Sequence, residues 1–334
     1  MRRTVYVGQY AGGATCGVWT LSVDDETGRM ACVDFAENLD DTLWLTLSAD
    51  GTRLYAGRAG GVTVFDTTGR ALRTVAAYET GGSQPPCHLS LSADGRRLYF
   101  AVYTDARCGI VDLESGQVRA TTLAGHGPNA ARQEKAHAHC AQETPNARSL
   151  AVADFGSDAI WTFDLLKLTP QGKFRMPPGS GPRHLVFHPW GAFAYVIFEL
   201  SNTIGVYRFA SDRFEPLQFV PLLPEGFVNP SQAAALKLSA DGRQLFATNR
   251  GLDTAVAFDI DQTTGFLSQG VQSPLGGCWP RDLTLLPGGR IAIACLERTG
   301  EVRACAYEVT TRLFHVLEHH VALHRPVVDR KSVV

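Results

Sequence analysis

One pattern repeats along the chain, and it limits the folds that the chain can adopt. Three of its copies read LSADGTRLYAGRAGGVTVFD from residue 47, LSADGRRLYFAVYTDARCGIVD from residue 91 and LSADGRQLFATNRGLDTAVAFD from residue 238. In each copy an apolar run leads into an Asp-Gly turn, and two more apolar runs follow. Asp-Gly between alternating apolar runs is a strong signal for a β-hairpin. The pattern therefore predicts antiparallel sheets.

Three weaker copies extend the pattern over most of the chain. They read ETPNARSLAVADFGSDAIWTFD, FHPWGAFAYVIFELSNTIGVYRF and LLPGGRIAIACLERTGEVRACAY. The turns of the six copies follow one another at intervals of 44 to 52 residues, at Gly51, Gly95, Ala147, Gly191, Gly242 and Gly289. Repeats of this length with about four short strands each are typical of a β-propeller, whereas a solenoid usually has fewer strands per repeat. We therefore expect an all-β propeller.

The two ends of the chain supply a seventh unit. TVYVGQY, CGVWTLSVD and GRMACVDFAE near the N-terminus give three strands of a unit that lacks its innermost strand. HRPVVD near the C-terminus can provide that strand. Joining both ends in one blade closes the ring and leaves no sheet edge exposed between them. We expect residues 1–334 to form one seven-bladed propeller domain with its ring closed in this way.

Charged side chains recur at the positions that should surround the central mouth of the ring. In each unit the innermost strand leads into the turn and the second strand leaves it. The start of the first strand and the end of the second therefore lie on the same face, away from the turns. The polar residues seven or eight positions from a turn are His139, Arg183, Arg281, Glu199, Arg250, Glu297 and Arg58. Because loops converge there, the cluster predicts a site for a small anionic ligand.

Two intervals between turns are longer than the others and carry inserted segments on the mouth side. They contain LAGHGPNAARQEKAHAH and VPLLPEGFVNPSQ, each before the innermost strand of its unit. Inserts in such loops favour a functional role, here as walls of a pocket. The first insert includes Arg132, Gln133, His137 and His139. Because side chains alternate along a strand, the two histidines are expected to point the same way.

These motifs together resemble the lactonase family of seven-bladed propellers typified by bacterial 6-phosphogluconolactonase, with a fungal carboxymuconate cyclase as a distant relative. The resemblance runs the whole length of the chain, and GPNAARQEKAHAH and the GPRH at 181 to 184 are its most specific parts. It implies an enzyme of carbohydrate metabolism, in the pentose phosphate pathway, that opens a sugar-acid lactone. The implied active site comprises His137 or His139, Arg183, Glu199 and Arg250.

Several positions depart from the family pattern. Arg58 and Ala59 stand where the family usually has Asn-Glu, and Val102 stands in a frequent Ala-Asn-Tyr step. An expected asparagine of the last full unit is Cys295. The chemistry-bearing positions are kept while several rim positions differ. The reaction class is therefore better indicated than the substrate, which is 6-phosphogluconolactone or another aldonolactone.

A mechanism follows from the types of these residues. Histidine titrates near neutral pH and suits the activation of water, so His137 or His139 is the expected base. Arginine binds oxyanions and carboxylates but cannot act as a base, so Arg183 and Arg250 should hold the lactone carbonyl and an anionic tail. Glu199 should orient a ring hydroxyl, the histidine or the water. The expected substrate contacts are Arg132, Gln133, Arg58, Arg281 and Glu297.

Three other interpretations stay open. A lactonising cyclase of the muconate type could use the same groups in the reverse direction. A non-catalytic propeller could bind a partner at its mouth, although such a scaffold should present apolar rim residues. A metal site built from His137, His139 and Glu199 is disfavoured by the neighbouring arginines Arg183 and Arg250, because their charge opposes a dication. We expect neither a metal nor a cofactor.

Charge and cysteine usage bear on partners and compartment. The formal net charge is −2, so no polyanion-binding surface and no nucleic-acid partner is expected. No signal-like or membrane-spanning apolar run is present, and the eight cysteines form no CxxC pair. The sequence therefore predicts a cytoplasmic protein with reduced thiols and no membrane association. It does not indicate an oligomeric state.

Overall fold

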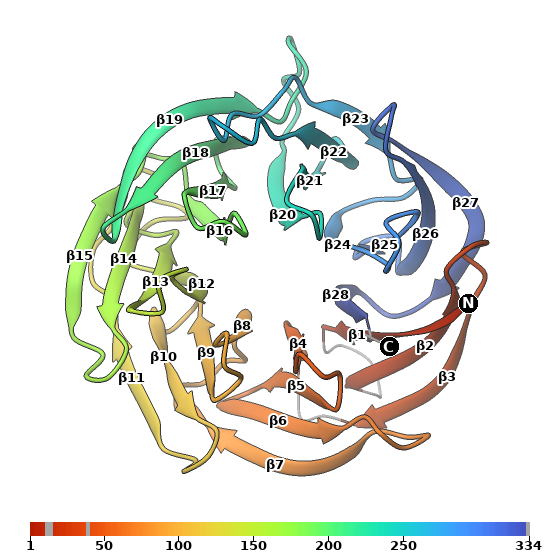
Figure 1. Cartoon of the computed structure of the whole chain (residues 1–334), viewed down its shortest axis with the longest axis horizontal. Helices are drawn as coiled ribbons and strands as arrows, with labels where there is room; N and C mark the ends of the chain where they lie inside the picture. Colours follow the sequence, from red (N-terminus) through yellow and green to blue (C-terminus); the bar gives the residue numbers. More distant parts are fainter. Residues whose placement is uncertain (11–15, 38–40, 332–334) are drawn as a thin grey trace.

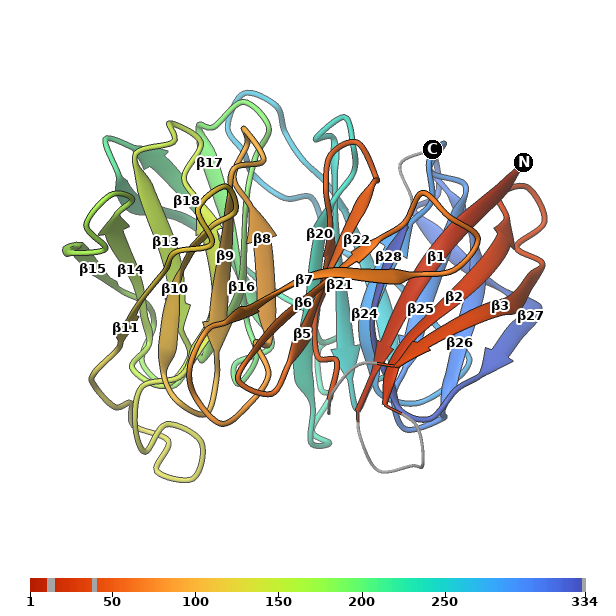
Figure 2. The same ribbon diagram turned by 90° about the horizontal axis from the view of Figure 1, so that it is seen from below.

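The computed structural model describes residues 1–10, 16–37 and 41–331, the last four of these by their backbone only. Within these residues the strands form seven four-stranded antiparallel sheets that stand around a ring (Figure 1). The predicted all-β, seven-bladed propeller is thereby confirmed. Figure 2 shows the ring from its edge, with the strands running between its two faces. No helix in the described part of the chain is long and apolar enough to cross a membrane.

Six blades follow one another along the chain, each with its innermost strand first. The strands of blades 1 to 3 are β4(Leu45–Leu47), β5(Arg53–Arg58), β6(Gly61–Asp66) and β7(Arg73–Glu79), then β8(His88–Leu91), β9(Arg97–Val102), β10(Arg107–Asp112) and β11(Val118–Thr122), then β12(Ala138–Glu143), β13(Ser149–Asp154), β14(Ala159–Asp164) and β15(Pro170–Arg175). The strands of blades 4 to 6 are β16(Pro182–Phe187), β17(Phe193–Phe198), β18(Thr203–Ala210) and β19(Arg213–Pro221), then β20(Gln232–Leu238), β21(Gln244–Arg250), β22(Thr254–Asp259) and β23(Val271–Pro274), then β24(Pro280–Leu285), β25(Ile291–Leu296), β26(Glu301–Glu308) and β27(Leu313–Ala322).

The seventh blade joins the two ends of the chain, as predicted. Its strand order is β28-β1-β2-β3, and its strands are β28(Pro326–Lys331), β1(Arg2–Gln9), β2(Gly17–Asp24) and β3(Met30–Glu37). β28 is antiparallel to β1 and occupies the innermost position (Figure 1). Without β28 the backbone donors and acceptors on one side of β1 would be unpaired, so this closure protects the edge of the sheet.

The hydrophobic core lies between neighbouring blades. All six residues of the middle strand β13 are buried, whereas the outermost strand β15 of the same blade has only exposed and half-buried residues. One core cluster joins Tyr195 and Ile197 of β17 to Leu236 and Leu245 of blade 5. Middle strands are covered on both faces by adjacent blades, so they are mostly apolar and do not alternate.

The tight turns form as the repeated Asp-Gly pattern predicts. Gly51 has a φ of +70°, a conformation that glycine adopts easily, and its N–H donates to the Ser48 carbonyl at 2.9 Å. Ala147 takes the same place in blade 3 with a φ of +52°. Each turn reverses the chain on the face away from the mouth, so the second strand runs antiparallel to the innermost one. The open ends of both strands therefore lie at the mouth.

Candidate active site

A cavity of about 300 Å³ lies at the mouth, and residues from all seven blades line it. Its ionisable groups distinguish it from an ordinary core cavity, in which apolar side chains would be expected. These groups include four guanidinium groups, an imidazole and a buried carboxylate, from Arg132, Arg183, Arg250, Arg281, His139 and Glu199. The polar cluster expected from the positions flanking the turns therefore does converge.

β-bulges direct three of these side chains into the cavity. In blade 3, Ala138 pairs with Asp154 and Cys140 pairs with Ala153, so His139 is an extra residue in the register. Arg183 is the extra residue between Pro182 and His184 in blade 4, and Arg281 is the extra residue between Pro280 and Asp282 in blade 6. A bulge interrupts the alternation of faces and re-aims the side chain that it carries, which is why bulges are frequent beside functional sites.

Glu199 is the centre of the cluster. Its Oε1 accepts a hydrogen bond from Arg132 Nη2 at 2.8 Å. Its Oε2 lies 3.1 Å from Arg183 Nε and 2.7 Å from Arg250 Nη2. The glutamate is only 3% exposed, so these charge-assisted contacts are made away from bulk water. Both of its oxygens are used in holding arginines.

The charges of the cluster stabilise one another. Burial alone would raise the pKa of the Glu199 carboxyl, but Arg250 and Arg183 outweigh that effect and hold the pKa well below its usual range. Burial and the charge of Arg250 lower the pKa of Arg183 to about 9, which leaves its guanidinium protonated at pH 7. The cluster therefore contains more positive than negative charge at the centre of the mouth.

His139 is the histidine of the H-x-H pair that lines the cavity. Burial, with the positive charge of Arg183 as the next cause, holds the pKa of His139 well below 6.5. Its imidazole is therefore neutral at pH 7 and has one nitrogen free to accept a proton. Its Nδ1 lies 4.0 Å from the Cys87 sulfur, and its ring meets the Tyr103 ring edge to face at 5.5 Å.

His137 is placed differently from what strand alternation predicts. Its ring stacks on that of Tyr103 at 4.2 Å, and its Nδ1 lies 3.1 Å from the Tyr103 carbonyl oxygen. Its Nε2 lies 3.3 Å from a carboxylate oxygen of Glu134. His137 precedes β12 and the bulge at His139 follows it, so the period-two rule does not relate the two side chains. His137 does not line the cavity and supports Tyr103, which does.

Three of the expected substrate contacts also lie outside the cavity lining. Gln133 is fully buried, and its amide Nε2 donates to the Phe155 carbonyl and to Asp158 Oδ1, both at 2.8 Å. Arg58 pairs with Glu79 on the outer part of blade 1. The Glu297 carboxylate lies 3.4 Å from Arg281 Nη1 and 2.7 Å from Arg325 Nη2, so both of its oxygens pair with arginines.

Sequence reasoning overlooked several lining residues. Tyr10, Gln84 and Gln232 line the cavity but were not among the residues expected there. Gln232 ends the insert VPLLPEGFVNPSQ, whose length marked it as a wall of the pocket, so that signal could have identified it. Tyr10 ends TVYVGQY in the place that Tyr103 takes in RLYFAVY, so the repeat register could have identified it. Gln84 has no comparable signal.

The metal interpretation has little support in this arrangement. His137 is turned away from the cavity, and the two oxygens of Glu199 are occupied by guanidinium groups. In the part of the chain that the structure describes, no group of three or more His, Cys, Asp or Glu side chains is placed to hold a metal ion.

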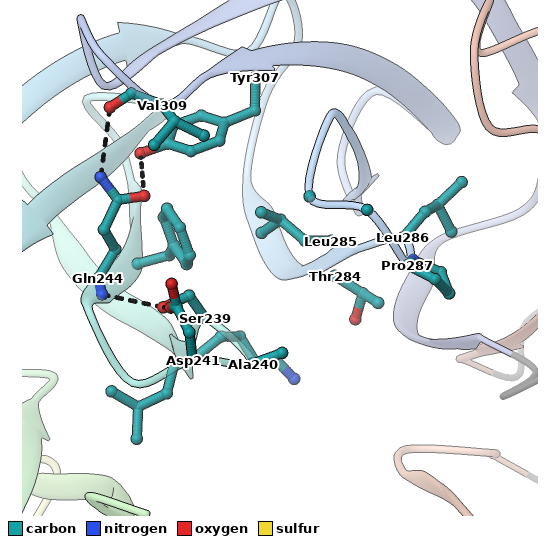
Figure 3. Close-up of a pocket in the computed structure, with 15 residues that line it drawn as sticks. Ser239, Ala240, Asp241, Gln244, Thr284, Leu285, Leu286, Pro287, Tyr307 and Val309 are labelled. Atoms are coloured by element: carbon teal, nitrogen blue, oxygen red, sulfur yellow. Dashed lines mark hydrogen bonds between the residues drawn. The ribbon is translucent and has the colours of Figure 1, made fainter.

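A second cavity, of about 470 Å³, lies between blades 5 and 6 on the face of the turns. Tyr307 donates a hydrogen bond of 2.9 Å to Gln244 Oε1, which joins the two blades. Figure 3 shows these two side chains at the edge of the cavity. The ammonium group in its lining, that of Lys237, is paired with Asp282 at 2.8 Å. This cavity is mostly apolar and lacks a cluster of unbalanced charge, so the mouth is the better candidate for chemistry on an anionic ligand.

The chain is similar to several known proteins. The family model described as "Lactonase, 7-bladed beta-propeller" matches residues 4–330. The chain is 29% identical over 337 residues to the 6-phosphogluconolactonase of Bacillus subtilis, and the alignment covers 96% of each protein. The solved periplasmic gluconolactonase of Pseudomonas aeruginosa is 26% identical, with a TM-score of 0.91 and 100% of both chains covered. A putative 6-phosphogluconolactonase from Bacteroides fragilis is also 26% identical, with a TM-score of 0.88 and coverage of 99% and 98%.

Proposed function

Because the chain belongs to the lactonase family of seven-bladed β-propellers, we propose that it hydrolyses the ring of a sugar-acid lactone at the mouth of the ring of blades. The observation that carries the proposal is the buried cluster in which Glu199 holds three guanidinium groups beside a neutral His139. Such a site combines a proton acceptor with fixed positive charge. Hydrolysis of an ester through an anionic intermediate requires both.

The proposed first step is the attack of water on the lactone carbonyl. His139 accepts a proton from the water as its oxygen bonds to the carbonyl carbon, and the electron pair of the C=O bond moves to the oxygen. The guanidinium groups of Arg183 and Arg250 stabilise that oxyanion, because they are fixed and charged before the reaction begins. The intermediate then collapses, the ring C–O bond breaks, and the histidinium returns the proton to the leaving alkoxide. The product is the open-chain aldonic acid, whose new carboxyl group releases a proton to solvent and becomes the aldonate.

Glu199 has a different role from that of orienting water or a hydroxyl. Its low pKa keeps it ionised, and both of its oxygens bind arginines, so it is neither a base nor a free acceptor. It instead holds three like charges together, which would repel one another without it. We therefore assign Glu199 to the positioning of Arg132, Arg183 and Arg250.

The substrate would be small and anionic. The cavity volume is at the lower end of the range for ligand pockets, ~300–1,000 Å³. Arg132 and Arg281 are the more accessible of its arginines, with side chains 35% and 16% exposed, against 3% for Arg183. They lie on different blades and are suited to contact a charged group at the end of the substrate. This charge favours 6-phosphogluconolactone as the substrate, because an unphosphorylated aldonolactone is neutral until its ring opens.

A direct assay tests the proposal. The purified protein is offered 6-phosphogluconolactone, gluconolactone and muconolactone at neutral pH, and the rate of spontaneous opening is subtracted. We expect acceleration of at least one sugar lactone and none of muconolactone. Hydrolysis of muconolactone alone would instead favour the cyclase interpretation. No acceleration of any sugar-acid lactone, with a folded protein, would refute the proposal.

A further inference from the structure

Trp279 has an unusual backbone conformation beside the candidate active site. It immediately precedes β24, the strand that brings Arg281 into the cavity. Its φ is +65°, and it is the one aromatic residue among the described positions with a φ in the left-handed region. A bulky side chain is disfavoured there, and the following Pro280 further favours an extended conformation for the residue before it. Local preference therefore opposes the observed geometry.

Hydrogen bonds from two blades hold Trp279 in this conformation. Its N–H donates to Asp253 Oδ1 at 2.8 Å, from the loop that follows β21 in blade 5. Its carbonyl accepts a hydrogen bond from the Glu297 N–H at 3.0 Å, from the end of β25 in blade 6. Strain that the surroundings enforce in this way tends to be found at functional sites. A glycine would adopt this φ freely, so what the tryptophan adds is its ring.

Two guanidinium groups lie over the ring. The central carbon of Arg298 is 3.2 Å from the ring centroid, and that of Arg250 is 5.5 Å from it. Arg250 is 4% exposed, its Nη2 binds Glu199 and the Ala233 carbonyl, and its Nε is buried without a hydrogen-bond partner. An aromatic face is one of the few surfaces that can cover such a group, because it attracts a cation without competing for its hydrogen-bond donors.

We propose that Trp279 is a positioning residue for Arg250, and that the strained backbone is retained because it places the face of the indole over that guanidinium. The ring keeps water away from Arg250 and keeps Nη2 directed at Glu199, so the positive charge stays fixed where the substrate's developing oxyanion would lie. Trp279 does not line the cavity, so its ring is expected to act through Arg250 and not by contact with the substrate. The inference rests on the proposed function, since it assigns Arg250 to the binding of an anion.

Substitutions at this position separate the effect of the ring from the effect of the strained backbone. Trp279→Gly removes the ring and relieves the strain, Trp279→Ala removes the ring but keeps the strain, and Trp279→Phe keeps an aromatic face. We expect the Gly variant to melt at a higher temperature than the Ala variant. We expect both to lose about 10- to 30-fold in kcat/KM, the scale of a desolvated cation–π contact, and the Phe variant to stay within about threefold of the wild type. Ser211→Gly, at a left-handed position with a φ of +50° on the turn between β18 and β19, is the control and should keep full activity.

The comparison of activity with stability decides the proposal. If kcat/KM follows the melting temperature, so that Trp279→Gly recovers what Trp279→Ala loses, the ring has only a structural role and the proposal is wrong. Wild-type turnover in both ringless variants would overturn it as well.

A binding measurement distinguishes failure here from failure of the proposed function. Calorimetric titration with 6-phosphogluconate and gluconate reports anion binding without catalysis. We expect the Gly and Ala variants to bind the better aldonate about 10- to 30-fold more weakly than the wild type. If the wild type binds an aldonate but opens no lactone, the proposed function is wrong. The role of Trp279 is then judged by the ratio of the aldonate affinities of the wild type and the ringless variants. If the wild type neither binds nor hydrolyses, both proposals are wrong.

Discussion

Replacing Glu199 with glutamine tests the central claim about the mouth, namely that one carboxylate holds three arginines together. The substitution keeps the shape of the side chain and removes its charge. Removing one partner of a buried ion pair typically costs about 3–5 kcal/mol, because the remaining charge is left uncompensated. With an unfolding entropy of about 2.1 cal/mol/K per residue, a chain of 334 residues should then lose roughly 4–7 °C in melting temperature.

The matched control is Glu79→Gln. Glu79 also pairs with an arginine, Arg58, but its side chain is 74% exposed, so its loss should cost less than about 1 kcal/mol. Sulfate should raise the melting temperature of Glu199→Gln more than that of the control, because a dianion can enter between the three guanidinium groups. Lactone hydrolysis should fall sharply in Glu199→Gln and stay near the wild-type rate in the control.

The difference in the free energy of unfolding between the wild type and Glu199→Gln should also depend on pH. The folded-state pKa of Glu199 lies below its unfolded value, so its contribution is complete above the unfolded pKa and is lost as the pH falls toward the folded pKa. Taking an unfolded pKa of ~4.3, the gap between wild type and Glu199→Gln should narrow by about 1 kcal/mol between pH 7 and pH 3.5. Denaturant unfolding at both pH values measures it. A variant as stable as the wild type, or a gap that does not narrow, would refute the reasoning.

Three further predictions concern the base, the absence of a metal and the ring closure. His139→Ala should lower kcat by ~10²–10⁴-fold, whereas His137→Ala should lower it far less. Circular dichroism checks that both variants fold, and equal effects on kcat would mean that His139 is wrongly assigned as the base. Since the pKa of His139 is well below 6.5, kcat/KM should be flat from pH 6.5 to 7.5 and should fall only at lower pH, where the imidazole becomes protonated. Activity should survive dialysis against a strong chelator, and its loss with recovery upon addition of one divalent metal would reinstate a metal site. Deleting residues 324–334 removes β28 and exposes the edge of β1, so a truncated protein that melts like the full-length chain would contradict the closure.

The repeats allowed most of the fold to be derived from the sequence. A hairpin depends on a few adjacent residues, and turns such as the one at Gly51 are formed by local hydrogen bonds. Six copies of that local signal, together with complementary strands at the two ends, are consistent with one ring. The same register located His139, Arg183, Glu199, Arg250 and Arg281, because equivalent positions of all blades face one mouth.

The register did not decide which way an individual side chain points. His137 and His139 are two residues apart, yet one stacks on Tyr103 outside the cavity lining and the other lies within it. The cause is a bulge, which depends on how two strands pair and leaves no mark in the strand's own residues. Gln133 was expected at the substrate for its place in a specific motif, but its amide binds Phe155 and Asp158.

By itself, the sequence determined the architecture, the closure of the ring and the gathering of cations at its mouth, since each of these follows from local turns and a repeating period. Only the tertiary structure decided that Glu199 holds three arginines, that His139 is the neutral imidazole of the site, and that Trp279 is strained against Arg250. Those facts depend on distances between blades. Such distances are set when the seven sheets pack against one another, because burial and neighbouring charge act only once the groups have been brought together.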